Sequence, residues 1–429
     1  VMFDQCKALI IGLQKRGAVV GSSLNTAYLL ERLSQTLERL KTLMAIFVSN
    51  RYLPRRILLL TGCFARAAAE RHSISRLWKQ SSGLIARSVT QNAGDHGEHY
   101  ITRDKKEYWA MFYSAAGGGV LIALMALFKT YLGSIIDDKV WKGIAEGLNY
   151  GLGFMVIFML HFTVATKQPA MTAARFAEAV EKTPQGKTVN MKLAQLLVDV
   201  FRSQSIAVLG NVLIAMGLAA LIAFGYQYKT GEPLMNADQI AYQLHSIDPF
   251  AGTLWFAAIA GVWLFCSGII SGYFDNRSNY LNMRMRLTQH PLLKKLMSEK
   301  TRVKFANYMH ENYGSLIGNL CFGMLLGITG VVGYLTHLPL DIRHVAFSSA
   351  NVGYIAVSGH FAYSLLLQCI GFVLLIGLVN LIVSFSLTLW VALRSLNAEI
   401  DSWWPIWHEV CQIVKKRPLS LFLPVQLDK

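Results

Sequence analysis

The chain has 429 residues, of which 53% are hydrophobic and only 15% are charged. A soluble domain usually carries about 25% charged residues, so this composition argues against an ordinary soluble enzyme, and the high apolar content excludes intrinsic disorder. Lys and Arg number 41 against 25 Asp and Glu, a formal net charge of +16, which is typical of chains that face anionic lipid or nucleic acid.

Residues 1–107 predict a cytoplasmic domain of amphipathic helices. Between residues 30 and 47, apolar side chains recur at steps of three and four and charged ones fill the other face, which is the period of a helix. Further helical patterns run over 55–70 and 75–89, and the polar segment 91–98, with two glycines, predicts a linker. We expect the helices to pack within this domain; lipid headgroups or nucleic acid on its basic face are the alternative. Because residue 1 is Val, we expect the natural N-terminus to lie upstream.

Six later stretches are long and apolar enough to cross a membrane as helices, which takes about 20 residues. We therefore predict an all-α, polytopic fold, with a six-span membrane domain over 108–396 and a cytoplasmic interfacial tail over 397–429. The predicted spans are 108–132, 144–165, 206–226, 253–274, 316–335 and 363–393.

The loops between the spans alternate in charge. Loops 166–202 and 275–313 are rich in Lys and Arg, whereas 133–143 and 227–252 carry acidic residues. Since positively charged loops stay in the cytoplasm, we expect both termini on the cytoplasmic side and three hairpins that reach the far side.

Spans three and five begin alike, which predicts an internal repeat. The runs LGNVL (209–213) and IGNL (317–320) each lead through apolar sequence to a Pro-Leu pair, at 233–234 and 339–340. A short amphipathic stretch follows each pair, at 237–244 and 341–347, and GGGVL (117–121) is a weaker echo in span one. We predict three parallel hairpins, each with a short interfacial helix at its outer tip, as some transporters have; chance similarity of apolar segments is the alternative.

Small and polar residues within the spans have different expected roles. The GxxxG pairs Gly147/Gly151, Gly268/Gly272 and Gly323/Gly327 let helices approach closely, so packing is a sufficient explanation for them. Polar side chains inside a membrane are costly and usually face protein or water. They are His161, Thr163, Asn211, Ser267, Ser271, Asn319, Gln368, Asn380, Ser384 and Ser386.

The predicted ligand site lies at the cytoplasmic rim. Cations and amides follow spans two and four at headgroup level and would suit a phosphate or carboxylate; ordinary positive-inside anchoring also explains the cations. Asn211 and Asn319 occupy equivalent positions in the repeat and would either tie neighbouring helices or line a polar cavity. The predicted site residues are Lys167, Gln168, Arg175, Asn211, Asp275, Asn276, Arg277 and Asn319.

A second cluster, Asp341, Arg343 and His344, lies on the outer side. Asp341 and Arg343 can pair locally with His344 at the membrane interface, so a structural turn followed by an interfacial helix is the expected role. Near the C-terminus, Trp403, Trp404 and Trp407 fit a headgroup belt.

Enzyme and metal signatures do not stand out. The six cysteines lie far apart without CxxC or Cys/His ligand spacing, so we expect buried thiols, no metal site and no cofactor. Neither a phosphate-binding loop nor a nucleophile elbow nor an HExxH motif is present.

Four segments together resemble a known bacterial family: ATKQPAMTA (165–173), DNR (275–277), Gly318-Asn319 through Gly330, and LPLDIRHV (338–345). They resemble the polytopic membrane proteins catalogued as site-specific recombinases, and the resemblance covers roughly residues 20–400. It implies a protein of the bacterial inner membrane with a part in DNA rearrangement. No recombinase catalytic residue is carried over, because these motifs lie in or beside spans, which a duplex does not enter.

The main functional hypothesis is a non-enzymatic membrane protein that binds or translocates a small or lipidic, anionic solute, with membrane lipids as partners. The alternatives are a DNA-rearrangement role with nucleic acid as partner, a lipid-headgroup enzyme using His161 or Asp275 as base, and an assembly scaffold that needs a protein partner.

Overall fold

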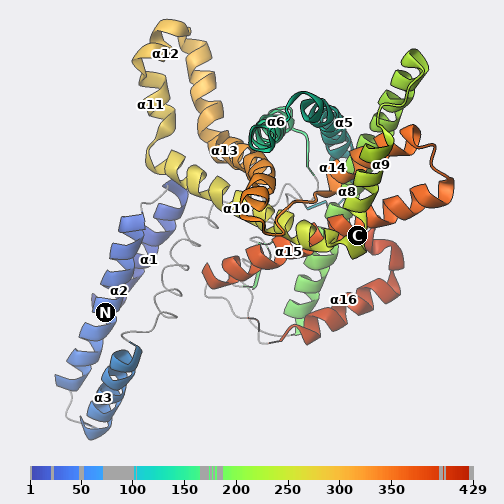
Figure 1. The fold of residues 1–429 in the computed structure, drawn as a ribbon. Helices are drawn as coiled ribbons and strands as arrows, with labels where there is room; N and C mark the ends of the chain where they lie inside the picture. The colour runs from blue at the N-terminus through green and yellow to red at the C-terminus, as the bar shows by residue number, and fades with distance from the viewer. Residues whose placement is uncertain are drawn as a thin grey trace. The chain divides into compact units, whose positions relative to one another are not determined.

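The computed structural model describes residues 2–20, 24–47, 53–70, 101–102, 104–164, 173, 176, 179–180, 187–395, 400 and 402–424. All regular structure in these ranges is helical, and they contain no β-strand (Figure 1). The predicted all-α class is confirmed.

The chain divides into two compact units. Unit 1 is Val1–Asn92 with Gly272–Tyr313, and unit 2 is Ala93–Ser271 with Gly314–Lys429. Helices α10 (Thr253–Tyr280) and α13 (Glu299–Thr336) contribute residues to both. The predicted domain limits at 107 and 396 stay predictions.

Unit 1 contains short and medium helices that carry most of its charge. The helical patterns over 30–47 and 55–70 are confirmed within α2 and α3, whereas 75–89 and 91–98 lie outside the described residues. Exposed ion pairs join α1 to α2, Lys7–Glu38 at 2.8 Å and Asp4–Lys41 at 3.5 Å. The helices are α1 (Met2–Val20), α2 (Leu24–Phe47), α3 (Leu53–Glu70), α11 (Met283–Gln289) and α12 (Pro291–Leu296).

Five helices in the described part of the chain are long and apolar enough to cross a membrane, which identifies a helical membrane protein. They match five of the six predicted spans. The five are α5 (Lys105–Ile135), α8 (Lys187–Thr230), α10, α13 and α15 (Tyr363–Ser395).

The second predicted span corresponds to α6 (Lys139–Met159), which is not among these five. Its 21 residues include Lys139, Lys142 and Glu146 in the first half, so it lacks the long apolar stretch of the five spans. It nevertheless packs deep in unit 2, because Tyr150 and Phe154 belong to the main hydrophobic core.

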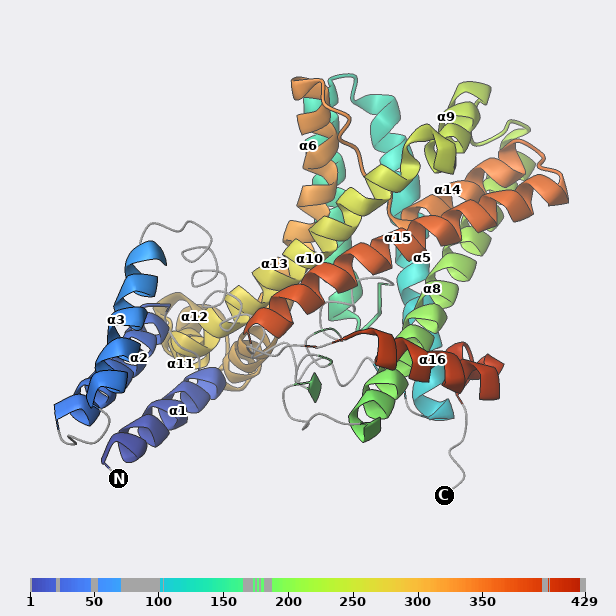
Figure 2. The ribbon, with the colours of Figure 1, turned by 90° about the horizontal axis from the view of Figure 1, so that it is seen from below.

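The two ends of unit 2 are marked by different helices. Helix α9 (Ala237–Ile247) follows the last turn of α8, and α16 (Trp404–Lys416) packs beside its first turns. Figure 2 shows α9 and α16 at opposite ends of the α8 ribbon. We refer to these as the α9 end and the α16 end.

Helix α8 is longer than a membrane crossing requires. At 1.5 Å per residue its 44 residues span about 66 Å, against about 30 Å of hydrocarbon. Its first turns lie at the α16 end. There they form a second hydrophobic core, in which Leu193 and Val198 pack with Leu389, Ile406 and Val410.

Two glycine pairs form a very close helix crossing between α6 and α13. Gly147 and Gly151 of α6 face Gly323 and Gly327 of α13, and a Cβ added at Gly323 would clash with the backbone of Gly151. The packing role expected for these pairs is confirmed, since only glycine permits such an approach.

The two predicted interfacial helices have different outcomes. The stretch 237–244 lies within α9, where Asn236 and Gln239 form a capping box. The stretch 341–347 was wrongly predicted as helical from its start: residues 341–344 are not helical, and α14 (Val345–Ser358) begins only at Val345. The Ile342 N–H bonds to Asp341 Oδ1 and the Arg343 N–H to Phe256 O, so the backbone donors there have partners outside a helix.

The remaining short elements are the 3₁₀ turns η2 (Pro249–Ala251) and η3 (Pro418–Leu421). The first joins α9 to α10 and the second follows α16.

Candidate functional site

Between α13 and α15 the chain folds back into unit 2 instead of crossing it. Helix α14 has 14 residues, about 21 Å, which is too short to span a membrane, and most of its residues are buried. Its first N–H, of Val345, bonds near the middle of α15, whereas its last residue, Ser358, accepts from Met235 N–H at the α9 end. Residues 337–358 thus enter from the α9 end and return to it, and we call them the re-entrant hairpin.

Asn380 of α15 holds the deepest point of this hairpin. Its Oδ1 accepts from the N–H of Val345 at 3.2 Å, and its Nδ2 donates to Ala257 O at 2.7 Å and to Arg343 O at 3.0 Å. The side chain is fully buried, so one amide binds three backbone groups, two in the hairpin and one in α10, at a place where unpaired polar groups are costly.

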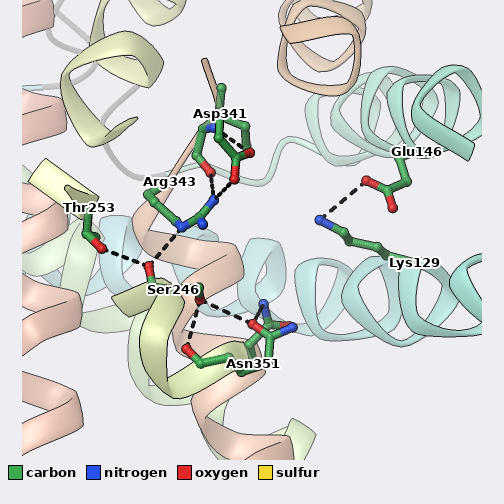
Figure 3. A network of polar contacts seen from close by, with 9 residues as sticks. Lys129, Glu146, Ser246, Thr253, Asp341, Arg343 and Asn351 are labelled. Atoms are coloured by element: carbon green, nitrogen blue, oxygen red, sulfur yellow. Dashed lines mark hydrogen bonds and ion pairs between the residues drawn. The ribbon is translucent and has the colours of Figure 1, made fainter. Parts of the chain in front are cut away.

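Arg343 organises the extended arm of the hairpin (Figure 3). Its Nη1 pairs with Asp341 Oδ2 at 2.6 Å and its Nε donates to Ser246 O at 2.8 Å. The guanidinium also lies 5.4 Å from the ring centre of Phe256. The predicted local pair of Asp341 and Arg343 is therefore confirmed.

A second ion pair joins α5 to α6 near the same end. Lys129 Nζ lies 3.4 Å from Glu146 Oε2, as Figure 3 shows, with side-chain exposures of 37% and 14%. Both residues lie within helices of the apolar bundle, where ionisable residues are costly and mark functional sites by default. The sequence analysis did not select this pair, because its members lie 17 positions apart and each lies near a predicted span end.

Tyr150 lies between the Lys129–Glu146 pair and the re-entrant hairpin. Its ring lies 5.6 Å from Lys129 Nζ and 4.4 Å from the ring of Phe347 in α14. Lys129, Glu146, Tyr150, Asp341 and Arg343 therefore form one polar layer against the re-entrant hairpin, and we use that name below.

The sequence analysis expected His344 at the membrane interface, but the structure buries this side chain inside the bundle. It is 1% exposed, and its ring faces Phe154, Phe322 and Phe347 at centre distances of 5.7 to 6.3 Å. The reason is the re-entrant path, which carries the chain inward at this residue instead of along the surface.

Asn211 and Asn319, the predicted repeat equivalents, are both buried within helix packing. Asn211 Nδ2 donates to Ala115 O and to Thr163 O, so it ties α8 to α5 and to the segment after α6. Asn319 Nδ2 donates to Ser315 O of its own helix at 2.8 Å. Their contacts are thus not equivalent, and their role in ligand binding stays a prediction.

The other predicted rim residues are not all described. Asp275, Asn276 and Arg277 lie in the part of α10 that belongs to unit 1, where Arg277 Nη1 donates to Tyr273 Oη at 3.5 Å. Lys167, Gln168 and Arg175 lie outside the described residues. Their ligand-binding role is untested.

Within the described ranges, no group of three or more His, Cys, Asp or Glu could hold a metal ion. What the polar layer can do is electrostatic. Two cations are held by carboxylates in a partly buried setting, where charge-assisted contacts are strong. An incoming anion can compete with Glu146 for Lys129, or with Asp341 for Arg343.

Comparison with known proteins gives one positive result. No curated protein and no solved structure matches the chain. A family model described as "Site-specific recombinase" matches residues 1–424, nearly the whole length, and agrees with the resemblance of the four sequence segments. The chain belongs to the site-specific recombinase family.

Proposed function

We propose that this protein binds a small anionic solute at the polar layer and passes it across the membrane beside the re-entrant hairpin. The observation that carries the proposal is the presence of two partly buried ion pairs, Lys129–Glu146 and Asp341–Arg343, beside a hairpin that does not cross the bundle. Irregular backbone at membrane depth is tolerated where protein buries it or where it lines a polar cavity.

The proposal includes six crossings. Helices α5 and α6 are antiparallel: Lys129 meets Glu146 near the α9 end, and Ser114 Oγ bonds to Thr163 Oγ1 at 2.9 Å further along both. With α6 added to the five long apolar helices, the chain crosses the membrane six times, so both ends of the membrane domain lie on the same side. Because the loops at the α16 end carry the basic residues, the positive-inside rule places that end in the cytoplasm, and the family points to a bacterial inner membrane.

Anion flux into proteoliposomes tests this function. The purified full chain is reconstituted, and chloride, acetate and inorganic phosphate are supplied in turn as inward-directed gradients. We expect flux of at least one of the three above that of empty liposomes. Lys129→Met is expected to lower that flux about tenfold, the effect of one charge-assisted contact. Glu146→Gln frees Lys129 and is expected to lower the half-saturating anion concentration.

Lys105→Met is the matched control, since Lys105 is an exposed lysine in the first turn of the same helix. Its flux should equal that of the unmodified chain. Absence of flux for all three anions, or equal flux in the Lys129→Met and Lys105→Met variants, would contradict the proposal.

The family description favours a second candidate, a DNA-linked role. The segment of unit 1 over 283–304 is basic, with Lys294 and Lys295 in the last turn of α12. Duplex binding by the full chain in detergent, weakening steeply with salt, would support this role. Salt-independent or absent binding would count against it.

A further inference from the structure

A large apolar groove opens at the α16 end, far along the chain from the polar layer. It has a volume of about 790 Å³ and is formed by α8, α15 and α16, within the range of about 300–1,000 Å³ found for small-molecule sites. Among the described residues that line it, only Gln204 and Ser386 are polar.

The groove runs along α15, parallel to the helix axis, as an acyl chain of a membrane lipid would. Its lining runs from Leu378 to Leu393, which is about 22 Å of helix. That length exceeds one leaflet of an about 30 Å hydrocarbon layer. The groove therefore begins among residues of the membrane-crossing part of α15 and ends at the rim of the bundle.

The rim of the groove has the residues of a headgroup region. Trp390, Trp403 and Trp407 line it, and tryptophan is enriched where hydrocarbon meets water. The Arg394 guanidinium lies 4.9 Å from the ring centre of Trp390, so a fixed cation lies at the mouth. Helix α16 adds Lys415 and Lys416 in its last turn.

We propose that this groove binds one acyl chain of an anionic phospholipid, with the headgroup at Arg394. The apolar lining suits a hydrocarbon chain, and Arg394 suits a phosphate group. The tryptophan residues lie between them, where the glycerol of the lipid would lie. The site is separate from the polar layer, and it specifies a lipid that docks on the protein instead of a solute that passes through it.

Native mass spectrometry of the full chain in detergent tests the site with two added probes, phosphatidylglycerol and phosphatidylcholine. We expect one phosphatidylglycerol to remain bound per chain under conditions that strip phosphatidylcholine. Ser386→Trp fills the groove and should lower retention of phosphatidylglycerol at least tenfold. Leu374→Trp is the control, since Leu374 is an exposed residue of the same helix outside the groove, and it should retain lipid normally.

The headgroup contact has its own variant. Arg394→Gln should lower phosphatidylglycerol affinity about fivefold, the effect of one basic residue near an anionic surface, and leave phosphatidylcholine affinity unchanged. Equal loss of both lipids would overturn the headgroup assignment.

A spectroscopic measurement covers the case in which Ser386→Trp does not fold. Phosphatidylglycerol with a brominated chain should quench tryptophan fluorescence of the unmodified protein, and Trp407→Phe should reduce the quenched fraction. Unchanged quenching in Trp407→Phe, undiminished lipid retention in Ser386→Trp, or a second copy of the chain cross-linked to Trp407 would overturn the proposal.

Discussion

The two halves of helix α15 face different neighbours. Toward the α9 end, Val373 and Ile376 are covered by α14 of the same chain and share a buried cluster with Val345 and Val352. Toward the α16 end, Ile382 and Phe385 line the open groove. The sequence is similarly apolar in both halves, so hydrophobicity alone does not decide which half the chain covers.

The two halves differ in the hydrogen bonds that their polar side chains make to other segments. Asn380 lies where the covered half ends, and it bonds to the backbone of the hairpin and of α10. In the open half, Ser384 and Thr388 donate to carbonyls of their own helix. Buried hydrogen bonds select one specific partner segment in an apolar setting. An apolar groove without such bonds can bind any hydrocarbon chain of suitable size.

The largest effect is expected from Asn380→Leu. The substitution leaves the Val345 N–H and the Arg343 carbonyl buried without this partner, at about 1–3 kcal/mol per group, and removes the side-chain bond to Ala257 O of α10. We expect a loss of at least about 3 kcal/mol in the free energy of unfolding, measured by titration of detergent micelles with dodecyl sulfate. Ser386→Leu in the open half is the control and should change it by less than about 0.5 kcal/mol. Similar losses in the two variants would remove the proposed difference between the halves.

A somewhat smaller effect is expected at the glycine crossing of α6 and α13. Gly323→Ala places a methyl group against the backbone of Gly151, which cannot rotate away, so the helices must separate. Overpacking of this kind costs about 1–3 kcal/mol, and we expect the upper part of that range in thermal unfolding. Gly330→Ala has no atom within 4 Å of its new Cβ and should be neutral or stabilising. A stable Gly323→Ala protein would disprove the close approach.

A third substitution tests how tightly α14 covers α15. A Cβ at Gly377 would lie 2.9 Å from Val345 Cγ2, a side-chain atom that can shift, whereas a Cβ at Gly371 meets nothing within 4 Å. Gly377→Ala should therefore lower the free energy of unfolding by about 1 kcal/mol, and Gly371→Ala should not lower it. The reverse order would mean that α14 does not pack on this face.

The smallest effect is expected outside the bundle, between α1 and α2. The hydrogen bond and charge of Lys7 lower the pKa of Glu38 below its ordinary value of 4.5. A carboxyl whose folded-state pKa is depressed stabilises the contact above its unfolded pKa and loses that stabilisation as the pH falls through the folded value. Because both side chains are exposed, the unfolding temperature of Glu38→Gln should equal that of the parent.

Hydrogen exchange detects this contact more sensitively. The parent should protect the amides of α1 slightly more than Glu38→Gln at pH 7, and the difference should vanish in acid below the folded-state pKa. A difference that persists in acid would assign the protection to another cause.

Much of the helical architecture follows from the sequence, because spans depend on local apolar content. The limits of α5, α10 and α15 lie close to the predicted ones for this reason, whereas α13 begins 17 residues before its predicted start. The re-entrant hairpin does not follow, since α14 is an apolar segment between a Pro-Leu pair and a glycine, and nothing local distinguishes a surface turn from a path that folds inward.

The candidate site was only partly predictable for a related reason. The Asp341–Arg343 pair is local in sequence and was found, whereas Lys129 and Glu146 meet only through the packing of α5 on α6. Asn380 was noted as a polar residue inside a span, but its three partners come from α10 and the hairpin, so its role depends on tertiary structure.

The most direct test of the re-entrant hairpin is its topology in the membrane. Single cysteines are placed at Leu338, Phe347 and Tyr363 in a cysteine-free background and labelled with an impermeant maleimide in sealed, oriented vesicles. We predict labelling of positions 338 and 363 from the same side and none at position 347, which is buried. Labelling of 338 and 363 from opposite sides would mean that residues 337–358 cross the membrane, and would contradict both the hairpin and the proposed site.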